Sequence, residues 1–138
     1  MIQKKTGADL FRIEPETPYT GSYEDVVDQA KIEIEDGFQP PIQPLHAKLE
    51  KYDTIVLGTP VWWYTMAPPI FTFLSQNDFS GKKVIPFATN AGWLGHTFGD
   101  ISKACAGSEM GKSMNIEFSG KTLKTDEKTI ADWIASIV

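Results

Sequence analysis

The chain has 138 residues, of which 41% are hydrophobic and 22% are charged, and we interpret residues 1–138 as a single globular domain. Its formal net charge of -5 argues against nucleic acid as a partner, because phosphate binding needs clustered cations. The single cysteine, Cys105, excludes an intrachain disulfide. No apolar run has the length of a membrane span and no charged-then-apolar leader opens the chain, so we expect no membrane association and a cytoplasmic location.

The first third of the chain predicts helices joined by a short strand and a proline-rich loop. Ser22 and Asp25 have the spacing of a capping box, and Gly37 is a typical helix stop, so a helix is expected between them. Its predicted apolar stripe is Tyr23, Val26, Val27, Ala30 and Ile34. The other expected elements are a helix end at 2–6 closed by Gly7, a strand at 10–13, a crossing at 39–44 and a helical turn at 46–51.

The rest of the chain alternates strands with helices. Pro68 or Pro69 is suited to the first turn of a helix, and Thr125 is expected to cap the last one. The expected strands lie at 54–57, 84–88 and 114–118, and the expected helices follow each of them. Such alternation predicts an α/β fold with a parallel sheet and right-handed crossovers.

A loop with three adjacent aromatic residues follows the strand at 54–57. In open α/β sheets, ligands bind outside the carboxyl ends of the strands, and flat aromatic rings suit a planar cofactor. We interpret this loop as one wall of a flavin site, with core packing and a partner interface as the alternatives for its rings. Its candidate residues are Thr59, Pro60, Val61, Trp62, Trp63, Tyr64 and Thr65.

Four segments carry a resemblance to the flavodoxin-like family, in particular to its short single-domain members. They are YDTIVLGTPVWW at 52–63, FTFL at 71–74, DFSGK at 78–82 and PFATN at 86–90. The resemblance covers almost the whole chain. It implies a three-layer sandwich around a five-stranded parallel sheet in the order 2-1-3-4-5, with FMN held at the carboxyl ends of the strands.

The resemblance also assigns the two loops that would hold the isoalloxazine ring. The aromatic loop corresponds to the first, and the second is implied at Thr89, Asn90, Ala91, Gly92, Trp93, Gly95 and His96. In the second loop, backbone N–H groups and a small polar side chain meet the pyrimidine edge of the ring in the family. His96 either supplies a proton near the ring or is a surface residue with no role.

The chain differs from the family pattern at its beginning. The family's first strand and the Ser/Thr-Gly loop that binds the FMN phosphate have no counterpart here, which leaves four expected strands and puts FMN occupancy in question. Three alternatives follow: the natural start lies upstream of Met1, the strand at 10–13 pairs directly with the strand at 54–57, or another chain donates a strand.

These observations predict an FMN-binding electron-transfer protein with a redox partner protein or a small-molecule acceptor. The alternatives are an NAD(P)H-dependent quinone reductase and a cofactor-free remnant that serves as a binding or scaffold module, with a homodimer as one form. His46, His96 and Cys105 lie too far apart in sequence for a metal-site motif, so no metal is expected.

Overall fold

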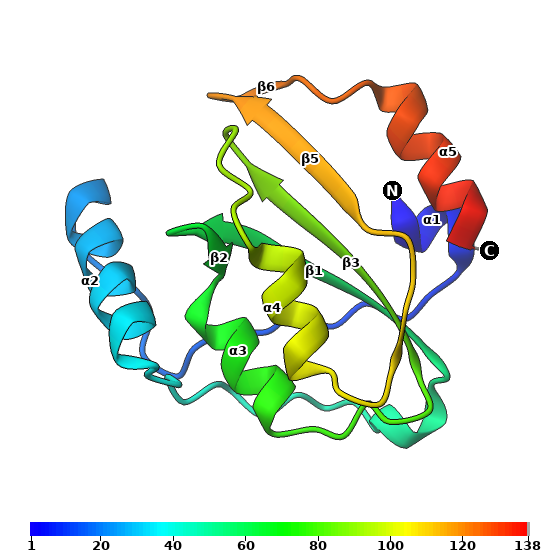
Figure 1. Ribbon diagram of the computed structural model, residues 1–138, viewed down its shortest axis with the longest axis horizontal. Coiled ribbons are helices and arrows are strands. Elements are labelled where there is room, and N and C mark those ends of the chain that lie inside the picture. The colour runs from blue at the N-terminus through cyan, green and yellow to red at the C-terminus, as the bar shows by residue number, and fades with distance from the viewer. Residues whose placement is uncertain (138) are drawn as a thin grey trace.

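The computed structural model describes residues 1–137 and contains helices and strands in alternation (Figure 1). Its elements are α1 (Ile2–Thr6), α2 (Tyr23–Asp36), the 3-10 turn η1 (Leu49–Lys51), β1 (Thr54–Trp62), β2 (Thr65–Met66), α3 (Pro68–Ser75), β3 (Lys83–Asn90), α4 (Thr97–Ala104), β4 (Glu109–Met110), β5 (Met114–Ser119), β6 (Thr122–Leu123) and α5 (Glu127–Ile137). The expected strands at 54–57, 84–88 and 114–118 and the expected helices at α3, α4 and α5 are confirmed.

The centre of the sheet is formed by three parallel strands in the order β1-β3-β5. Residues 54–60 of β1 pair in parallel with residues 83–89 of β3, and residues 87–90 of β3 pair with 114–117 of β5. Two short antiparallel strands extend this centre, with β2 beside β1 and β6 beside β5, while β4 pairs with the start of β3. The sheet is therefore mixed but mostly parallel.

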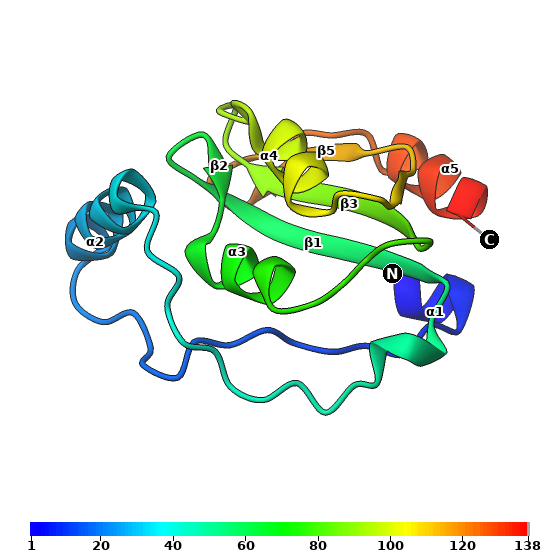
Figure 2. The ribbon, with the colours of Figure 1, turned by 60° about the horizontal axis from the view of Figure 1, so that its bottom comes forward.

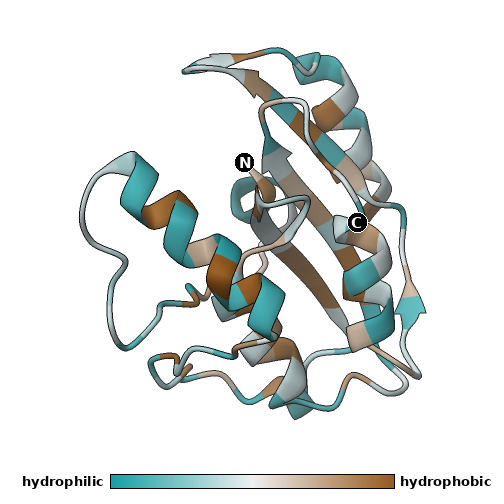
Figure 3. Ribbon diagram, turned by 60° about the vertical axis from the view of Figure 1, so that its left-hand side comes forward, coloured by the Kyte–Doolittle hydropathy of each residue, from teal (hydrophilic) through white to brown (hydrophobic). Residues whose placement is uncertain are grey.

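The side chains of successive residues in the central strands pack into two separate cores, one on each face of the sheet. Leu57 and Val84 belong to the core under α3 and α4, whereas Ile85 and the partly buried Val56 belong to the core under α5. Because side chains alternate between the faces of a strand, both faces need cover, and β1 and β3 are accordingly rich in apolar residues (Figure 3). The result is the expected three-layer α/β sandwich (Figure 2).

The helix α2 begins and ends where its capping signals predict. The Ser22 hydroxyl accepts from the Asp25 N–H at 3.1 Å, the Asp25 carboxylate accepts from the Ser22 N–H at 3.0 Å, and Gly37 ends the helix at φ 64°. The expectation that Tyr23 faces a core is wrong, because 84% of its surface is exposed. Only one turn of the helix buries side chains, at Ala30 and Glu33.

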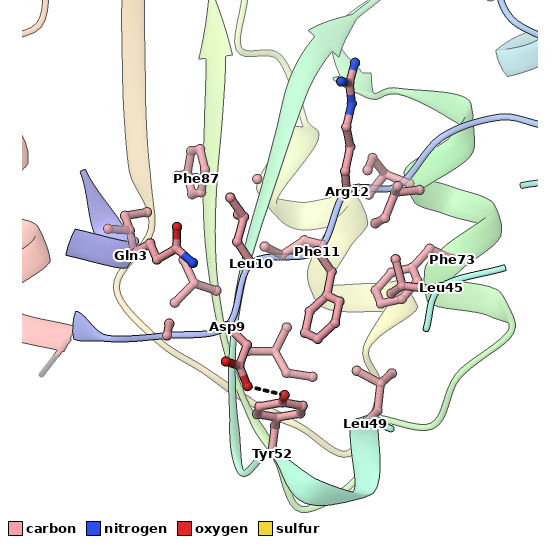
Figure 4. A pocket seen from close by; sticks show the side chains of 18 of the residues that line it. Gln3, Asp9, Leu10, Phe11, Arg12, Leu45, Leu49, Tyr52, Phe73 and Phe87 are labelled. Carbon is pink, nitrogen blue, oxygen red and sulfur yellow. Dashed lines mark hydrogen bonds between the residues drawn. The ribbon is translucent and has the colours of Figure 1, made fainter. Parts of the chain in front are cut away.

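The predicted strand at 10–13 is absent from the structure. This segment is extended but makes no ladder, and the adjoining chain forms one isolated bridge, between Pro15 and Ile42. A cavity separates residues 10–13 from β1 (Figure 4). The alternative in which this segment pairs directly with β1 is therefore wrong, since backbone pairing needs strands about 4.8 Å apart.

The start of α5 also differs from expectation. The Thr125 hydroxyl accepts from the Glu117 N–H in β5 at 2.7 Å, and the cap is made by Asp126, whose carboxylate accepts from the Lys128 N–H at 3.0 Å. Thr125 therefore ties the helix start to the sheet. Within residues 1–137, none of the helices combines the length and the hydropathy that a membrane crossing needs.

Candidate functional site

The aromatic loop is the turn of a tight hairpin between β1 and β2. Val61 pairs with Met66, and Trp62 pairs with Thr65, so Trp63 and Tyr64 are its two turn residues, with φ values of 50° and 66°. Such turns favour Asn-Gly, because bulky residues are strained at positive φ. The sequence gives no signal for this turn, since neither residue is one that the conformation favours.

Both tryptophans of the loop lie against neighbouring structure. Trp62 packs edge-on against Tyr19, with ring centroids 5.0 Å apart. The Trp63 indole N–H donates to the Val27 carbonyl at 2.8 Å, and the Lys31 ammonium lies 5.0 Å from the centroid of that ring. Trp63 therefore fixes α2 to the hairpin, and the two tryptophans do not form one shared platform.

Tyr64 instead faces the second predicted loop. Its ring meets Trp93 edge-on, with centroids 6.3 Å apart and planes at 86°. The two rings are 46% and 65% exposed, so they offer aromatic surface outside the strand ends. The structure thus brings together one aromatic residue from each predicted loop.

The backbone fixes the two loops to one another. The His96 N–H donates to the Tyr64 carbonyl at 2.9 Å. Gly95 has φ 58°, and a Cβ built there would lie 2.4 Å from the Cβ and the carbonyl oxygen of Tyr64. Only glycine allows this approach, so Gly95 is needed for both its φ and its lack of a side chain.

The remaining residues of the second loop shape its turn. The Asn90 side chain accepts from the Gly92 N–H at 2.9 Å and donates to the side-chain oxygen Oδ1 of Asn115, so its amide is committed within the protein. Ala91 and Gly92 are exposed at the tip, and Thr89 is half-buried in β3. The exposed tip, rather than the Asn90 side chain, is therefore the part of this loop that a ligand can approach.

Two hydrogen bonds of the Thr59 side chain hold the base of the first loop together. The buried Thr59 hydroxyl accepts from the Ala67 N–H at 3.1 Å and donates to the Pro60 carbonyl at 2.7 Å. Val61 is half-buried within the strand. These residues support the hairpin, so among the predicted ligands of the first loop Tyr64 presents the most exposed ring.

A hydrogen-bonded array of three side chains lies beside the loops, and sequence reasoning missed its central member. Asp100 accepts from the Thr65 hydroxyl at 2.5 Å and contacts Nδ1 of His96 through the same carboxylate oxygen. The spacing of four residues between His96 and Asp100 on α4 is the signal that could have indicated the pair. Because Nδ1 faces a carboxylate, it carries a proton, which leaves Nε2 as the outward atom.

A cavity of about 610 Å³ adjoins this array, between α2, α3 and α4. Its polar lining includes Thr65, His96 and Asp100 together with Glu33 and Lys103, and its apolar lining includes Phe38 and Phe71. A small molecule with an apolar body and polar substituents matches such a lining.

Two titrating groups near these elements are shifted by their surroundings. Burial, followed by the hydrogen bond to Glu33 at 2.6 Å, raises the pKa of the Tyr19 hydroxyl well above its usual value. Burial likewise raises the pKa of the Cys105 thiol, which is buried directly after α4.

The fold and the paired loops define a class, the open α/β proteins whose ligand site lies at the carboxyl ends of parallel strands. The family model for flavodoxin matches residues 1–136, so the chain belongs to the flavodoxin family. No curated protein matched the chain.

Solved structures of similar fold cover nearly the whole chain. A Bacteroides eggerthii protein assigned as a flavoprotein superimposes with a TM-score of 0.79 at 26% identity, over 99% of this chain and 85% of that one. One from Bacteroides uniformis gives 0.80 at 26%, over 97% and 85%. A Lactobacillus acidophilus flavoprotein in complex with FMN gives 0.73 at 23%, over 96% and 85%, and shows similarity of fold.

Proposed function

We propose that this flavodoxin-family chain binds FMN and acts in electron transfer. The observation that carries the proposal is the joining of the two loops, in which the Tyr64 carbonyl accepts from the His96 N–H and the exposed rings of Tyr64 and Trp93 meet. This arrangement gives a planar ligand an aromatic edge and glycine-bearing backbone at the carboxyl ends of β1 and β3.

The residues present fit the ring of FMN better than its phosphate. Gly92, at φ 108°, and the exposed Ala91 leave the tip of the second loop open to close approach. The starts of α3 and α4 are poor phosphate sites, because α3 begins with two prolines and α4 has no side-chain cap. We therefore expect FMN to bind through its ring, and with modest affinity.

The chain would contribute binding and electrostatics to the reaction. FMN supplies the electron-carrying ring, and the protein tunes that ring through its contacts. Tyr64 and Trp93 would exclude water from one side of it, and Nε2 of His96 would hold or release a proton beside it. The net charge of -5 would disfavour further negative charge on a bound flavin, and so would lower the reduction potential of that flavin.

The acceptor is proposed to be a redox partner protein or a small molecule. The cavity of about 610 Å³ next to His96 and Asp100 favours the second, and with it an NAD(P)H-dependent quinone reductase as the second candidate function. We also propose that the chain works as a single domain in the cytoplasm, without nucleic acid or membrane partners, as a monomer or a homodimer.

Titration with FMN tests the first proposal. The protein should quench FMN fluorescence and perturb its visible absorption, and Trp93→Ala should weaken binding about tenfold, the equivalent of one aromatic contact. Trp63→Phe is the matched control, because Trp63 lies against α2, and it should bind FMN like the parent. If FMN produces neither signal, the proposal fails and the cofactor-free binding or scaffold module remains.

Steady-state assays separate the carrier from the reductase. A reductase oxidises NAD(P)H continuously when a quinone and FMN are supplied, whereas a carrier does not. In the reductase, His96→Asn should lower turnover while leaving FMN affinity within a few-fold of the parent. Unchanged turnover in this variant would remove the proton-transfer role from His96.

A further inference from the structure

The cavity of about 610 Å³ lies where the outlying helix α2 meets α3 and α4 (Figure 1). The helix buries only Ala30 and Glu33, so most of its surface is not used for packing within the chain. Its last turn and the residues after it line the cavity, through Glu33, Ile34, Gly37 and Phe38. The volume lies within the range of small-molecule sites. An occupant would therefore give the end of α2 packing that the chain itself does not supply.

Glu33 is a buried carboxylate in the lining of this cavity. The residue is only 8% exposed, and it accepts from the Tyr19 hydroxyl at 2.6 Å and from the Gln29 side-chain amide at 3.2 Å. Both partners are neutral groups, so neither balances the negative charge. Burying a charge without an opposite one is costly. A cationic occupant of the cavity would supply that opposite charge.

Two further features make the polar lining favour a cation. The carbonyl end of α2 carries partial negative charge, and the last turn of this helix contains no basic residue. Across the cavity, both contacts of Asp100 with Thr65 and His96 use Oδ2, so Oδ1 can still accept from a ligand. Lys103 adds one ammonium in the last turn of α4, and the two carboxylates outnumber it.

The apolar lining contains two aromatic rings. Phe38 is 51% exposed although it borders the cavity, and the partly buried Phe71 packs on the core from α3. Aromatic faces attract cations, and they also cover the apolar body of a ligand. The lining thus combines carboxylates with aromatic rings, which is the combination that suits an amine on an aromatic body.

We propose that this cavity binds a small organic cation, an ammonium group carried on an aromatic body. The ammonium lies toward Glu33, Asp100 and the end of α2, and the body lies against Phe38 and Phe71. A neutral molecule of the same shape would leave the charge of Glu33 unbalanced, and an anion would be repelled by it. The inference concerns binding at a site with its own lining, so it goes beyond the proposed electron transfer and does not require FMN.

Three probes with the same indole body and different charge test the site in the whole protein without FMN. They are the cation tryptamine, the neutral alcohol tryptophol and the anion indolepropionate. Tryptamine should raise the melting temperature and slow hydrogen exchange in the last turn of α2. By calorimetry, tryptophol should bind about tenfold more weakly than tryptamine, and indolepropionate should bind more weakly still. Salt should weaken the binding of tryptamine more than that of tryptophol.

Charge-changing variants of the same size locate the ammonium. Glu33→Gln and Asp100→Asn should each lower the affinity for tryptamine and leave the affinity for tryptophol unchanged, and a fall in only one of them places the ammonium at that carboxylate. Lys103→Gln, at an exposed position, should raise the affinity for tryptamine. Glu24→Gln is the matched control and should change neither affinity, because Glu24 is in the first turn of α2, about 14 Å along the helix from Glu33.

A variant of the aromatic lining tests the placement of the body. Phe38→Ala should weaken tryptamine and tryptophol together, and since the ring is half exposed the fold should persist.

Three results would overturn the proposal. The first is equal or tighter binding of tryptophol or indolepropionate, which would mean that the site does not select a positive charge. The second is an unchanged affinity for tryptamine in both Glu33→Gln and Asp100→Asn. The third is binding of tryptamine that Phe38→Ala leaves unaltered, with no protection of α2. The probe series on the parent needs no variant, so it decides the charge preference even if a buried substitution prevents folding. A failure of FMN to bind would leave all of these results unaffected.

Discussion

Trp63 is joined to α2 by a hydrogen bond from its indole N–H to the carbonyl oxygen of Val27, at 2.8 Å. Lys31, one turn further along the helix, places its ammonium 5.0 Å from the centroid of the same ring. The Trp63 ring therefore holds the outlying helix α2 to the hairpin (Figure 1). Within the aromatic loop, Trp63 therefore has a structural role, whereas the proposed contact with the cofactor belongs to Tyr64.

Trp63→Phe should loosen α2 without unfolding the sheet. The change removes the indole donor and weakens the cation–π contact, which together are worth about 1–2 kcal/mol at a half-exposed position. Hydrogen exchange should accelerate in α2 and stay unchanged in β3. Lys31→Met, which removes only the cation, should produce a smaller acceleration. If the amides of α2 exchanged hydrogen equally fast in the parent and in Trp63→Phe, the inference that Trp63 holds α2 to the hairpin would be wrong.

The longer helices and the three central strands could be predicted because each of them has its own local signal. Ser22 and Asp25 begin α2, Gly37 ends it, and the prolines at 68 and 69 open α3. The strand at 10–13 could not be judged in this way, because a strand needs a neighbour to pair with. Leu10 and Phe11 have strand-like composition, but the edge of β1 lies across a cavity from them.

Gly95→Ala should separate the two loops. The alanine must adopt φ near 58° and its Cβ would lie 2.4 Å from Tyr64 backbone and Cβ atoms, so something must shift. We expect a loss of at least about 2 kcal/mol of unfolding free energy, together with the loss of FMN uptake. Chemical denaturation and FMN titration measure both.

Gly99→Ala is the matched control for this change. Gly99 lies within α4, and a Cβ there meets nothing within 4 Å. Since alanine is the better helix former, the unfolding free energy should rise by about 0.5–1 kcal/mol with FMN uptake unchanged. A destabilisation as large as that of Gly95→Ala would show that the effect is not specific to the contact between the loops.

The sequence predicted the candidate site as two separate loops, and the structure shows that these loops contact each other. The sequence marks Tyr64 and Trp93 as aromatic residues that follow strands, but their contact depends on the register of β1 against β3. Asp100 was missed because its role is visible only when Thr65, far away in sequence, is brought to its carboxylate. Tertiary placement, rather than any local pattern, determines both relations.

Tyr64→Gly should make the hairpin more stable. Tyrosine at φ 66° carries a left-handed penalty of about 1–2 kcal/mol, which glycine relieves. The lost contact with Trp93 offsets less than this, because both rings are largely in solvent. We expect a net gain below about 1 kcal/mol by denaturant unfolding. Tyr64→Ala removes the ring but keeps the strain, so it should be less stable than the parent.

Tyr19→Phe should remove a loss of stability that the parent shows in alkali. Burial and then the Glu33 carboxylate raise the pKa of Tyr19 in the folded protein above the unfolded value of about 10. Below that pH both states keep the proton, and the hydrogen bond contributes about 1 kcal/mol. As pH rises further, the unfolded chain loses the proton first, so unfolding becomes easier in the parent.

The direction of this pH dependence is tested by measuring the unfolding free energies of the parent and of Tyr19→Phe between pH 8 and pH 11.5. The difference between the two proteins should stay constant up to about pH 10 and then shrink as the pH rises. Tyr52, whose pKa is also raised, by its hydrogen bond to Asp9, titrates in both proteins and therefore cancels in the comparison. A difference that grows in alkali would mean that the Tyr19 hydroxyl is not held protonated by its bond to Glu33.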